Sequence, residues 1–127
     1  MKYIVETDKS VEQAVADVEK ATKSNSFGVL HVHNLQQTMK NKGVDFPNEC
    51  CILEICNPHK ANAVLTADMS MNLALPCRIS VYSENGQTKI GMIKPKALLS
   101  VLSDAPELLD VAREVEETTM AIIDQAK

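Results

Sequence analysis

The chain has 127 residues, of which 45% are hydrophobic and 24% charged, a composition that predicts one globular domain over residues 1–127 with a single hydrophobic core. Its net charge of −4 argues against a nucleic-acid or anionic-membrane partner, because both require a clustered basic face. No apolar run approaches the roughly 18–20 residues of a membrane span, and aromatic residues make up only 3%, so the core must be aliphatic.

The first residues predict a strand rather than a secretion signal. Residues 3–6 read as the strand, and Thr7, Asp8 and Lys9 follow at once, which leaves no apolar segment of a signal peptide. We therefore expect a cytoplasmic protein. In that compartment its four cysteines should be reduced thiols rather than a disulfide framework.

The next segment predicts a helix over residues 10–23. Ser10 and Gln13 have the spacing of a capping box, in which the Ser10 side chain accepts from the Gln13 amide and the Gln13 side chain reaches back. Apolar residues then recur at helical spacing. They are Val11, Ala14, Val15, Val18 and Ala21.

Two strands with a short helix between them follow. Residues 27–33 and 50–56 read as strands, and Asn34 can cap a helix that runs to Lys42 and stops at Gly43. Asn57 and Pro58 then have the pattern of a cap and a first turn, which predicts a further helix over residues 58–66.

The last third predicts a hairpin and a long helix. Residues 78–83 and 88–93 flank an Asn-Gly pair at 85–86, which favours a type I′ turn. A helix opens near residues 104–107. Its buried stripe is predicted to hold Leu108, Val111, Ala112, Val115, Thr119 and Ile122.

Strands interrupted by unequal helices indicate an α+β two-layer sandwich, with helices on one face of a largely antiparallel sheet.

Three of the predicted strands sort their side chains into an apolar and a mixed set, because strand residues alternate between faces. The apolar sets, expected to meet the helices, are Gly28, Leu30 and Val32; Cys51, Leu53 and Ile55; and Cys77, Ile79 and Val81. If the strands share one sheet, the other side gathers Phe27, Val29, His31, His33, Cys50, Ile52, Glu54, Cys56, Arg78, Ser80 and Tyr82. Such a face suits a subunit interface or a shallow ligand site, and an ordinary half-solvated sheet surface also carries these residue types.

Cys56 is the cysteine with a candidate chemical role. It leaves a strand just before the helix that Asn57 and Pro58 start, and a thiol beside a helix N-terminus can react as the thiolate. His31 or His33 is then the candidate base. The alternative is that Cys56 only packs.

Metal and anion binding are two further hypotheses. His31 and His33 lie on one side of a strand, and with Cys56 or Glu54 from the neighbouring strand they could form a three-ligand site, which His59 could join. An anion could instead bind at the helix start near Asn57, with Arg78 as the counter-charge.

The segments Phe27-Gly-Val-Leu30, Ile52-Leu-Glu-Ile-Cys-Asn-Pro58 and Leu75-Pro-Cys-Arg-Ile-Ser-Val-Tyr82, followed by an Asn-Gly turn, resemble the domain of unknown function 302 family of small bacterial and archaeal proteins. The resemblance runs from about residue 3 to residue 122. It implies a TATA-binding-protein-like α+β fold, usually assembled as a homodimer, and no established enzymatic activity. The family pattern marks Cys56, Asn57, Pro58, Leu75, Pro76, Cys77 and Arg78 without assigning roles, and it does not include Cys50 or the His31–His33 pair.

These observations give a leading hypothesis and two alternatives. The leading one is a cytoplasmic, homodimeric, non-catalytic binding domain that holds a small ligand, an anion or a metal ion at the mixed face. Cys56 and Asn57 would contact the ligand, Arg78 would supply charge and Glu54 would orient it. The first alternative is a thiol-dependent enzyme or redox carrier that uses Cys56. The second is a subunit of a larger complex that docks through the acidic last helix. The sequence does not identify a cofactor.

Overall fold

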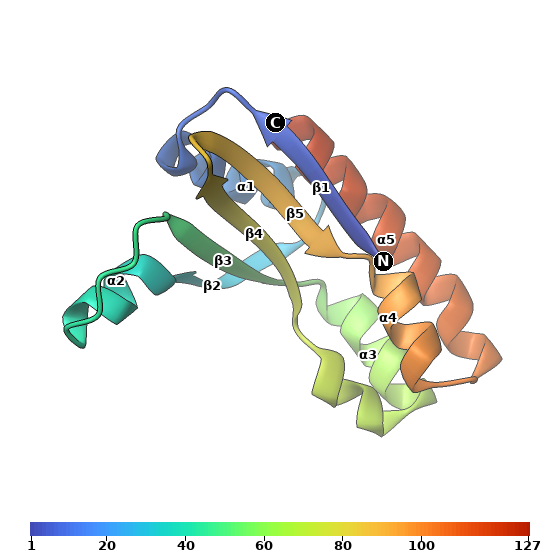
Figure 1. Ribbon diagram of the computed structural model, residues 1–127. Helices are drawn as coiled ribbons and strands as arrows, with labels where there is room; N and C mark the ends of the chain where they lie inside the picture. Colours follow the sequence, from blue (N-terminus) through green and yellow to red (C-terminus); the bar gives the residue numbers. More distant parts are fainter.

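Five strands form one open sheet in the computed structural model, which describes residues 1–127 (Figure 1). Every neighbouring pair is antiparallel, and the spatial order is β1-β5-β4-β3-β2. The α+β class and the antiparallel sheet predicted from the sequence are confirmed. The strands are β1 (Lys2–Thr7), β2 (Gly28–Asn34), β3 (Cys50–Cys56), β4 (Cys77–Glu84) and β5 (Gln87–Ile93).

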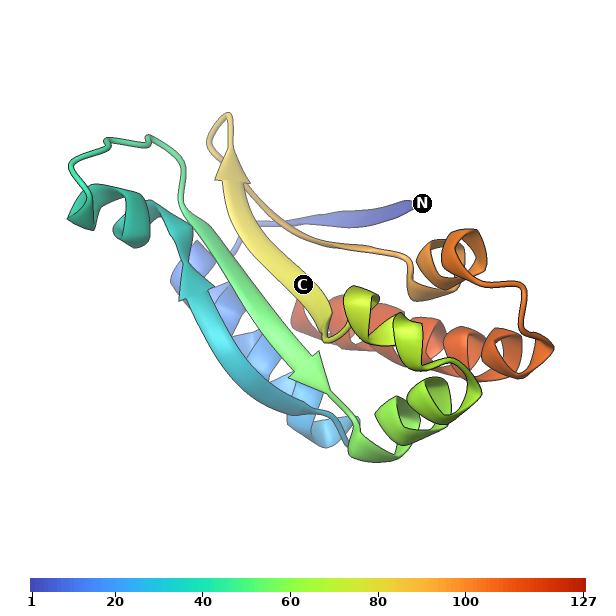
Figure 2. The same ribbon diagram turned by 90° about the horizontal axis from the view of Figure 1, so that it is seen from below.

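The helices divide into a layer under the sheet and a group beyond its end (Figure 2). The layer consists of α1 (Val11–Ser24) and α5 (Pro106–Ala126), which pack against each other. The end group consists of α3 (Pro58–Ala67), the 3₁₀ helix η1 (Met69–Ala74) and α4 (Pro95–Leu102), with α3 and α4 both packed on α5. A short helix, α2 (Leu35–Asn41), joins β2 to β3. None of the helices combines the length and apolar character that a bilayer crossing requires.

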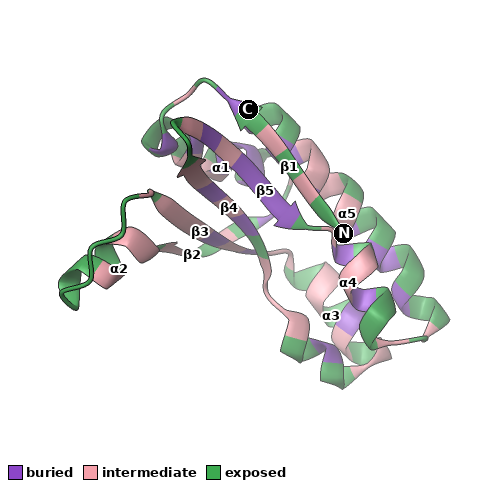
Figure 3. Ribbon diagram, in the orientation of Figure 1, coloured by how far each residue is buried: buried purple, intermediate pink, exposed green.

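The core lies between the sheet and the α1–α5 layer, where Figure 3 shows buried positions along the strands and helices. It is aliphatic as expected, and burying each large side chain contributes about 1.5–3 kcal/mol. All six residues predicted for the stripe on α5 are buried. The fully buried large side chains of the core include Leu53, Ile55, Ile79, Ile90, Leu108, Ile122 and Ile123.

Local signals explain most of the element boundaries. Ser10 caps α1 by accepting from the Gln13 backbone N–H at 3.1 Å. The second half of the predicted capping box does not form, because the Gln13 side chain donates to Asp17 instead. In the hairpin, Asn85 and Gly86 have φ of +52° and +77°, the two positive angles that the type I′ prediction required.

A β-bulge in β2 corrects the predicted faces of that strand. Val29 pairs with Ile55, whereas the next paired residue, His31, is opposite Glu54, so Leu30 is the extra residue. As a result Val29 shares the α1–α5 side, while Leu30 is 62% exposed instead of facing the helices. The strict alternation assumed from the sequence is therefore wrong before the bulge and correct after it, from His31 onward.

Two elements of the end group were not predicted from the sequence. They are η1, which Asp68 caps by accepting from the Ser70 N–H at 3.0 Å, and α4, which begins at Pro95. Pro95 at the first helical turn, followed by Leu98, Leu99 and Leu102, was a usable signal for α4. Both elements are central to the site described next.

Candidate functional site

The face of the sheet opposite α1 and α5, called here the open face, carries the polar residues of interest. Strands β2, β3 and β4 are neighbours, as the mixed-face prediction required. Cross-strand pairing places His31, Glu54 and Arg78 in one row. The adjacent row runs from His33 through Ile52, Ser80 and Gly91 to Ile4.

Glu54 is held by a hydrogen bond from His33, whose Nε2 contacts the carboxylate. The His31 ring stands edge-on to His33, with ring centroids 4.4 Å apart and planes at 73°. The hydrogen bond from His33 is the main cause that lowers the pKa of the Glu54 carboxyl, and the nearby positive charge of Arg78 lowers it further. Glu54 is thus an ionised carboxylate with a partner of its own.

The predicted metal ligands His31, His33 and Cys56 are not brought together. His33 is opposite Ile52 whereas Cys56 is opposite Gly28, four residues along β3, or about 13 Å at the rise of a strand. His59 is exposed in the first turn of α3. No group of three or more His, Cys, Asp or Glu side chains has an arrangement that could hold a metal ion.

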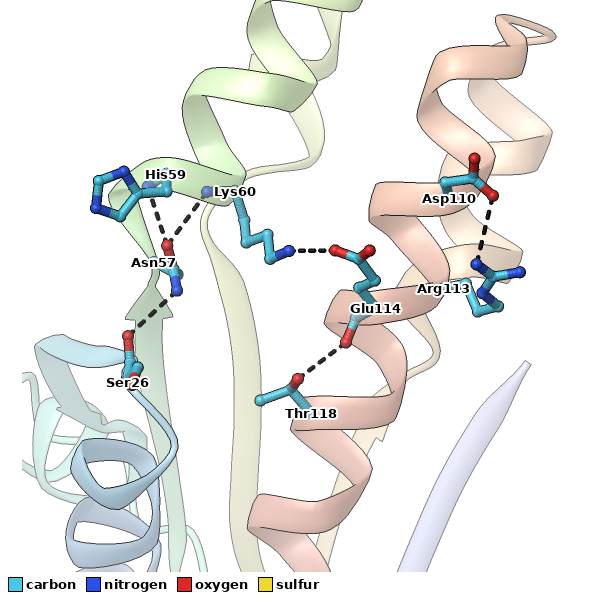
Figure 4. A network of polar contacts seen from close by, with 8 residues as sticks. All are labelled: Ser26, Asn57, His59, Lys60, Asp110, Arg113, Glu114 and Thr118. Atoms are coloured by element: carbon cyan, nitrogen blue, oxygen red, sulfur yellow. Dashed lines mark hydrogen bonds and ion pairs between the residues drawn. The ribbon is translucent and has the colours of Figure 1, made fainter.

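Asn57 serves as a structural cap. Its Oδ1 accepts from the backbone N–H groups of His59 at 2.9 Å and Lys60 at 3.2 Å, and its Nδ2 donates to the Ser26 carbonyl at 3.3 Å (Figure 4). The side chain therefore fastens the start of α3 to the turn that follows α1. The acceptor oxygen and one of the two N–H donors of this amide are thus engaged within the protein.

A groove of about 830 Å³ opens where the open face meets the end group. Twenty-seven residues line it, and 19 of them are hydrophobic. The groove has a floor on the open face and walls on α3, η1 and α4, and its lining extends to α5 and to the core residues Ile55 and Met92. Representative lining residues are Ile4 and Ile93 from the floor, Leu65, Leu73 and Leu98 from the walls, and Val115 from α5.

Gly91 shapes the floor of this groove. A Cβ at this position would lie 3.0 Å from Ile4 Cγ1 and 3.1 Å from the Tyr3 carbonyl oxygen, closer than ordinary contacts. The bare glycine lets the Ile4 side chain lie across β5, where it remains 47% exposed. Ile93, next to it on the floor, is 53% exposed.

The predicted site residues divide between the groove and its surroundings. Cys56 and Arg78 line the groove, whereas Glu54, Asn57, His31 and His33 do not. The groove could not be located from sequence because two of its walls, η1 and α4, were not predicted.

The two thiols of the groove differ from each other in environment. Burial, and to a smaller extent the neighbouring Cys56, together raise the pKa of Cys77 to about 11. Cys77 is therefore a protonated packing thiol at neutral pH, as its predicted place on the apolar face implied. Cys56, on the adjacent strand, forms no hydrogen bond with either imidazole of β2.

Comparisons with known proteins give a family and a fold but no activity. The family model described as "Domain of unknown function DUF302" matches residues 3–126. A crystal structure of an uncharacterized conserved DUF302 protein from Bacillus stearothermophilus is 35% identical and superposes with a TM-score of 0.94, covering 99% of this chain and 98% of that one. No curated protein matches the chain.

Proposed function

Because the chain belongs to the DUF302 family, whose name assigns no activity, we propose a function from the groove: the protein is a domain that binds a small, largely apolar molecule. The groove itself is the observation that carries this proposal. Ligand sites are typically concave spaces of roughly 300–1,000 Å³ with mostly apolar walls and a few polar groups, and this one has about 830 Å³ and 19 hydrophobic lining residues of 27. The polar minority includes Arg78, the residue expected to supply charge.

Exposed apolar side chains inside the groove give a ligand something to cover. Ile4, Ile93 and Leu73 are 47%, 53% and 85% exposed. Fully covering an aliphatic side chain of this size contributes about 1.5–3 kcal/mol. A molecule seated against all three would therefore gain affinity that a polar surface could not provide.

The test is binding of Nile red, an uncharged apolar dye whose fluorescence rises in a dry site. Wild-type protein should bind it saturably, with one dye per chain. Ser80→Trp should weaken binding at least tenfold, about 1.4 kcal/mol, because the half-buried Ser80 lies between Ile52 and Gly91 on the floor. Glu6→Trp is the control, since Glu6 is exposed on β1 outside the groove.

Two results of the Nile red experiment would reject the proposed function. One is the absence of saturable binding by the wild-type protein. The other is unchanged binding by a Ser80→Trp protein whose circular dichroism and unfolding midpoint show that it is folded.

The proposal includes a homodimer in the cytoplasm, in which a second copy covers the part of the open face that the groove leaves uncovered. The support is that α1 and α5 cover only one side of the sheet (Figure 2), and that edge strand β2 presents Leu30 at 62% exposure. Light scattering after size exclusion, at micromolar concentration, should give twice the chain mass, and Leu30→Lys should shift it toward the monomer. A monomer in the wild-type protein would reject the assembly.

A thiol-dependent enzyme or redox carrier is the second candidate, favoured by the presence of Cys56 and Cys77 in the same groove. It requires Cys56 to react as a thiolate. Iodoacetamide labelling over a pH series, with Cys56→Ser as the blank, should then show an apparent pKa well below the ordinary thiol value of about 8.5. Titration near that ordinary value removes the activated nucleophile and leaves the binding function.

A further inference from the structure

Resting on the proposed binding function, we propose that the ligand is an amphiphilic carboxylate: an aliphatic chain that lies in the groove, with its carboxylate held by Arg78. The choice of ligand class follows from three properties of the lining. They are the sign of its charges, the free donors of one guanidinium and the aliphatic character of its walls.

The charged residues of the groove all have one sign. The whole chain has 17 acidic and 13 basic residues, yet the lining contains three cations, Lys2, Lys60 and Arg78, and no Asp or Glu. An acidic protein that concentrates cations around an apolar space provides a favourable potential there for an anion.

Two of the three cations form no ion pair or side-chain hydrogen bond within the protein. Lys60 is neutralised by an ion pair with Glu114 of α5 (Figure 4). Lys2 and Arg78 form no ion pair, and no side-chain hydrogen bond of either residue was found in the structure.

Arg78 is the better of these two for recognising a carboxylate. It is the second residue of β4 and lies opposite Glu54, but the Glu54 carboxylate is already bound by His33. No hydrogen bond or ion pair engages the Arg78 guanidinium, so its donors stay available in a fork that fits the two oxygens of a carboxylate. Lys2 on β1 supplies a second positive charge in the same groove.

The walls favour an alkyl chain over a planar ring. Only two aromatic residues, Phe27 and Tyr82, are in the lining, so there is little surface for stacking. The remaining apolar residues are mainly aliphatic and come from strands β1, β3 and β5 and from helices α3, η1, α4 and α5, which gives an irregular surface to which a flexible chain can adapt. Leu73 and Leu98 from η1 and α4 are examples.

The experiment displaces Nile red with three molecules of equal chain length, each below its micelle concentration: dodecanoate, dodecanol and dodecyltrimethylammonium. Dodecanoate should bind at least tenfold more tightly than dodecanol, and the ammonium compound more weakly than dodecanol. Arg78→Gln should remove most of the preference for dodecanoate over dodecanol, and Arg78→Lys should keep part of it, because the charge remains without the fork. Arg113→Gln is the control, since Arg113 pairs with Asp110 on α5 outside the groove.

The outcomes separate this inference from the proposed function. Equal affinity for dodecanoate and dodecanol, or an undiminished preference in folded Arg78→Gln protein, rejects the carboxylate site while the apolar groove stands. Failure of all three molecules to displace bound dye rejects a ligand with an aliphatic chain. Failure of the wild-type protein to bind dye at all rejects both.

Discussion

At the scale of single residues, the site depends on a few side chains whose partners are fixed within the protein. Glu54 and Asn57 were expected to contact a ligand, but Glu54 binds His33 and Asn57 caps α3. Arg78 was expected to supply charge, and it lines the groove with its donors free. The residue that shapes the floor, Gly91, gave no signal in the sequence, because its role comes from the strand beside it.

Substitution of Gly91 by Ala should destabilise the protein by about 1–3 kcal/mol, the usual cost of overpacking. The new Cβ would meet Ile4 and the Tyr3 carbonyl at 3.0 and 3.1 Å. The matched control is Gly28→Ala, where the nearest atom is 3.8 Å from the Cβ and no loss is expected. The urea unfolding midpoint of each variant measures its loss of stability. Equal losses at the two glycines would show that the close contact with Ile4 and Tyr3 is not what makes Gly91 necessary.

The Glu54–His33 pair should make stability depend on pH in the acid range. The pKa of Glu54 is lowered in the folded protein, chiefly by the hydrogen bond from His33, so its contribution is present above the unfolded value of about 4.3 and is lost as pH falls through the lowered folded value. Glu54→Gln should be less stable than wild type at pH 6, and the difference should shrink by pH 3. A difference independent of pH would show that the carboxylate charge contributes nothing.

At the scale of elements, the end group decides where the groove lies. Helix α3 is tied to the turn after α1 through Asn57 and to α5 through the Lys60–Glu114 ion pair (Figure 4). Helix α4 and η1 complete the walls, and α4 packs on α5 and on η1.

Removal of the α3 cap by Asn57→Ala should cost about 1 kcal/mol of stability, as is typical for an N-cap. The control is Asn62→Ala, an exposed position within the same helix. Chemical denaturation of both variants gives the comparison. If the cap variant lost no more than the Asn62 variant, the Asn57 contacts would not be holding the helix.

At the scale of the whole molecule, stability should be uneven between the sheet and the end group. The central strands bury Leu53, Ile79 and Ile90 completely, whereas η1 and α4 leave Leu73, Val101 and Leu102 at 85%, 73% and 49% exposure. Elements with little buried apolar surface open locally at lower free energy.

Hydrogen exchange should therefore be faster at the amides of η1 and α4 than at those of β3 and β4. Dodecanoate, if it fills the groove, should slow exchange in these two helices more than in α1, which lies on the other side of the sheet. Uniform protection throughout the chain would show that the end group is as stable as the core.

The sequence by itself determined the local elements and the sheet class. Ser10, Asn34 and Asn57 cap helices as predicted, and the Asn85–Gly86 turn forms the hairpin, because capping and turn signals act between residues close in the chain. The buried stripe of α5 was readable for the same reason, since helical periodicity is a local property.

Only the tertiary structure decided where the site lies. The groove joins residues from β1, β5 and α5, which are distant in sequence. No local sequence pattern shows which helices will pack at the end of the sheet. The bulge at Leu30 and the close approach of Ile4 to Gly91 likewise arise from strand pairing. Residues far apart in the chain thus determine which charged side chains have a hydrogen-bond or ion-pair partner. They also place Arg78, which has none, beside an apolar space.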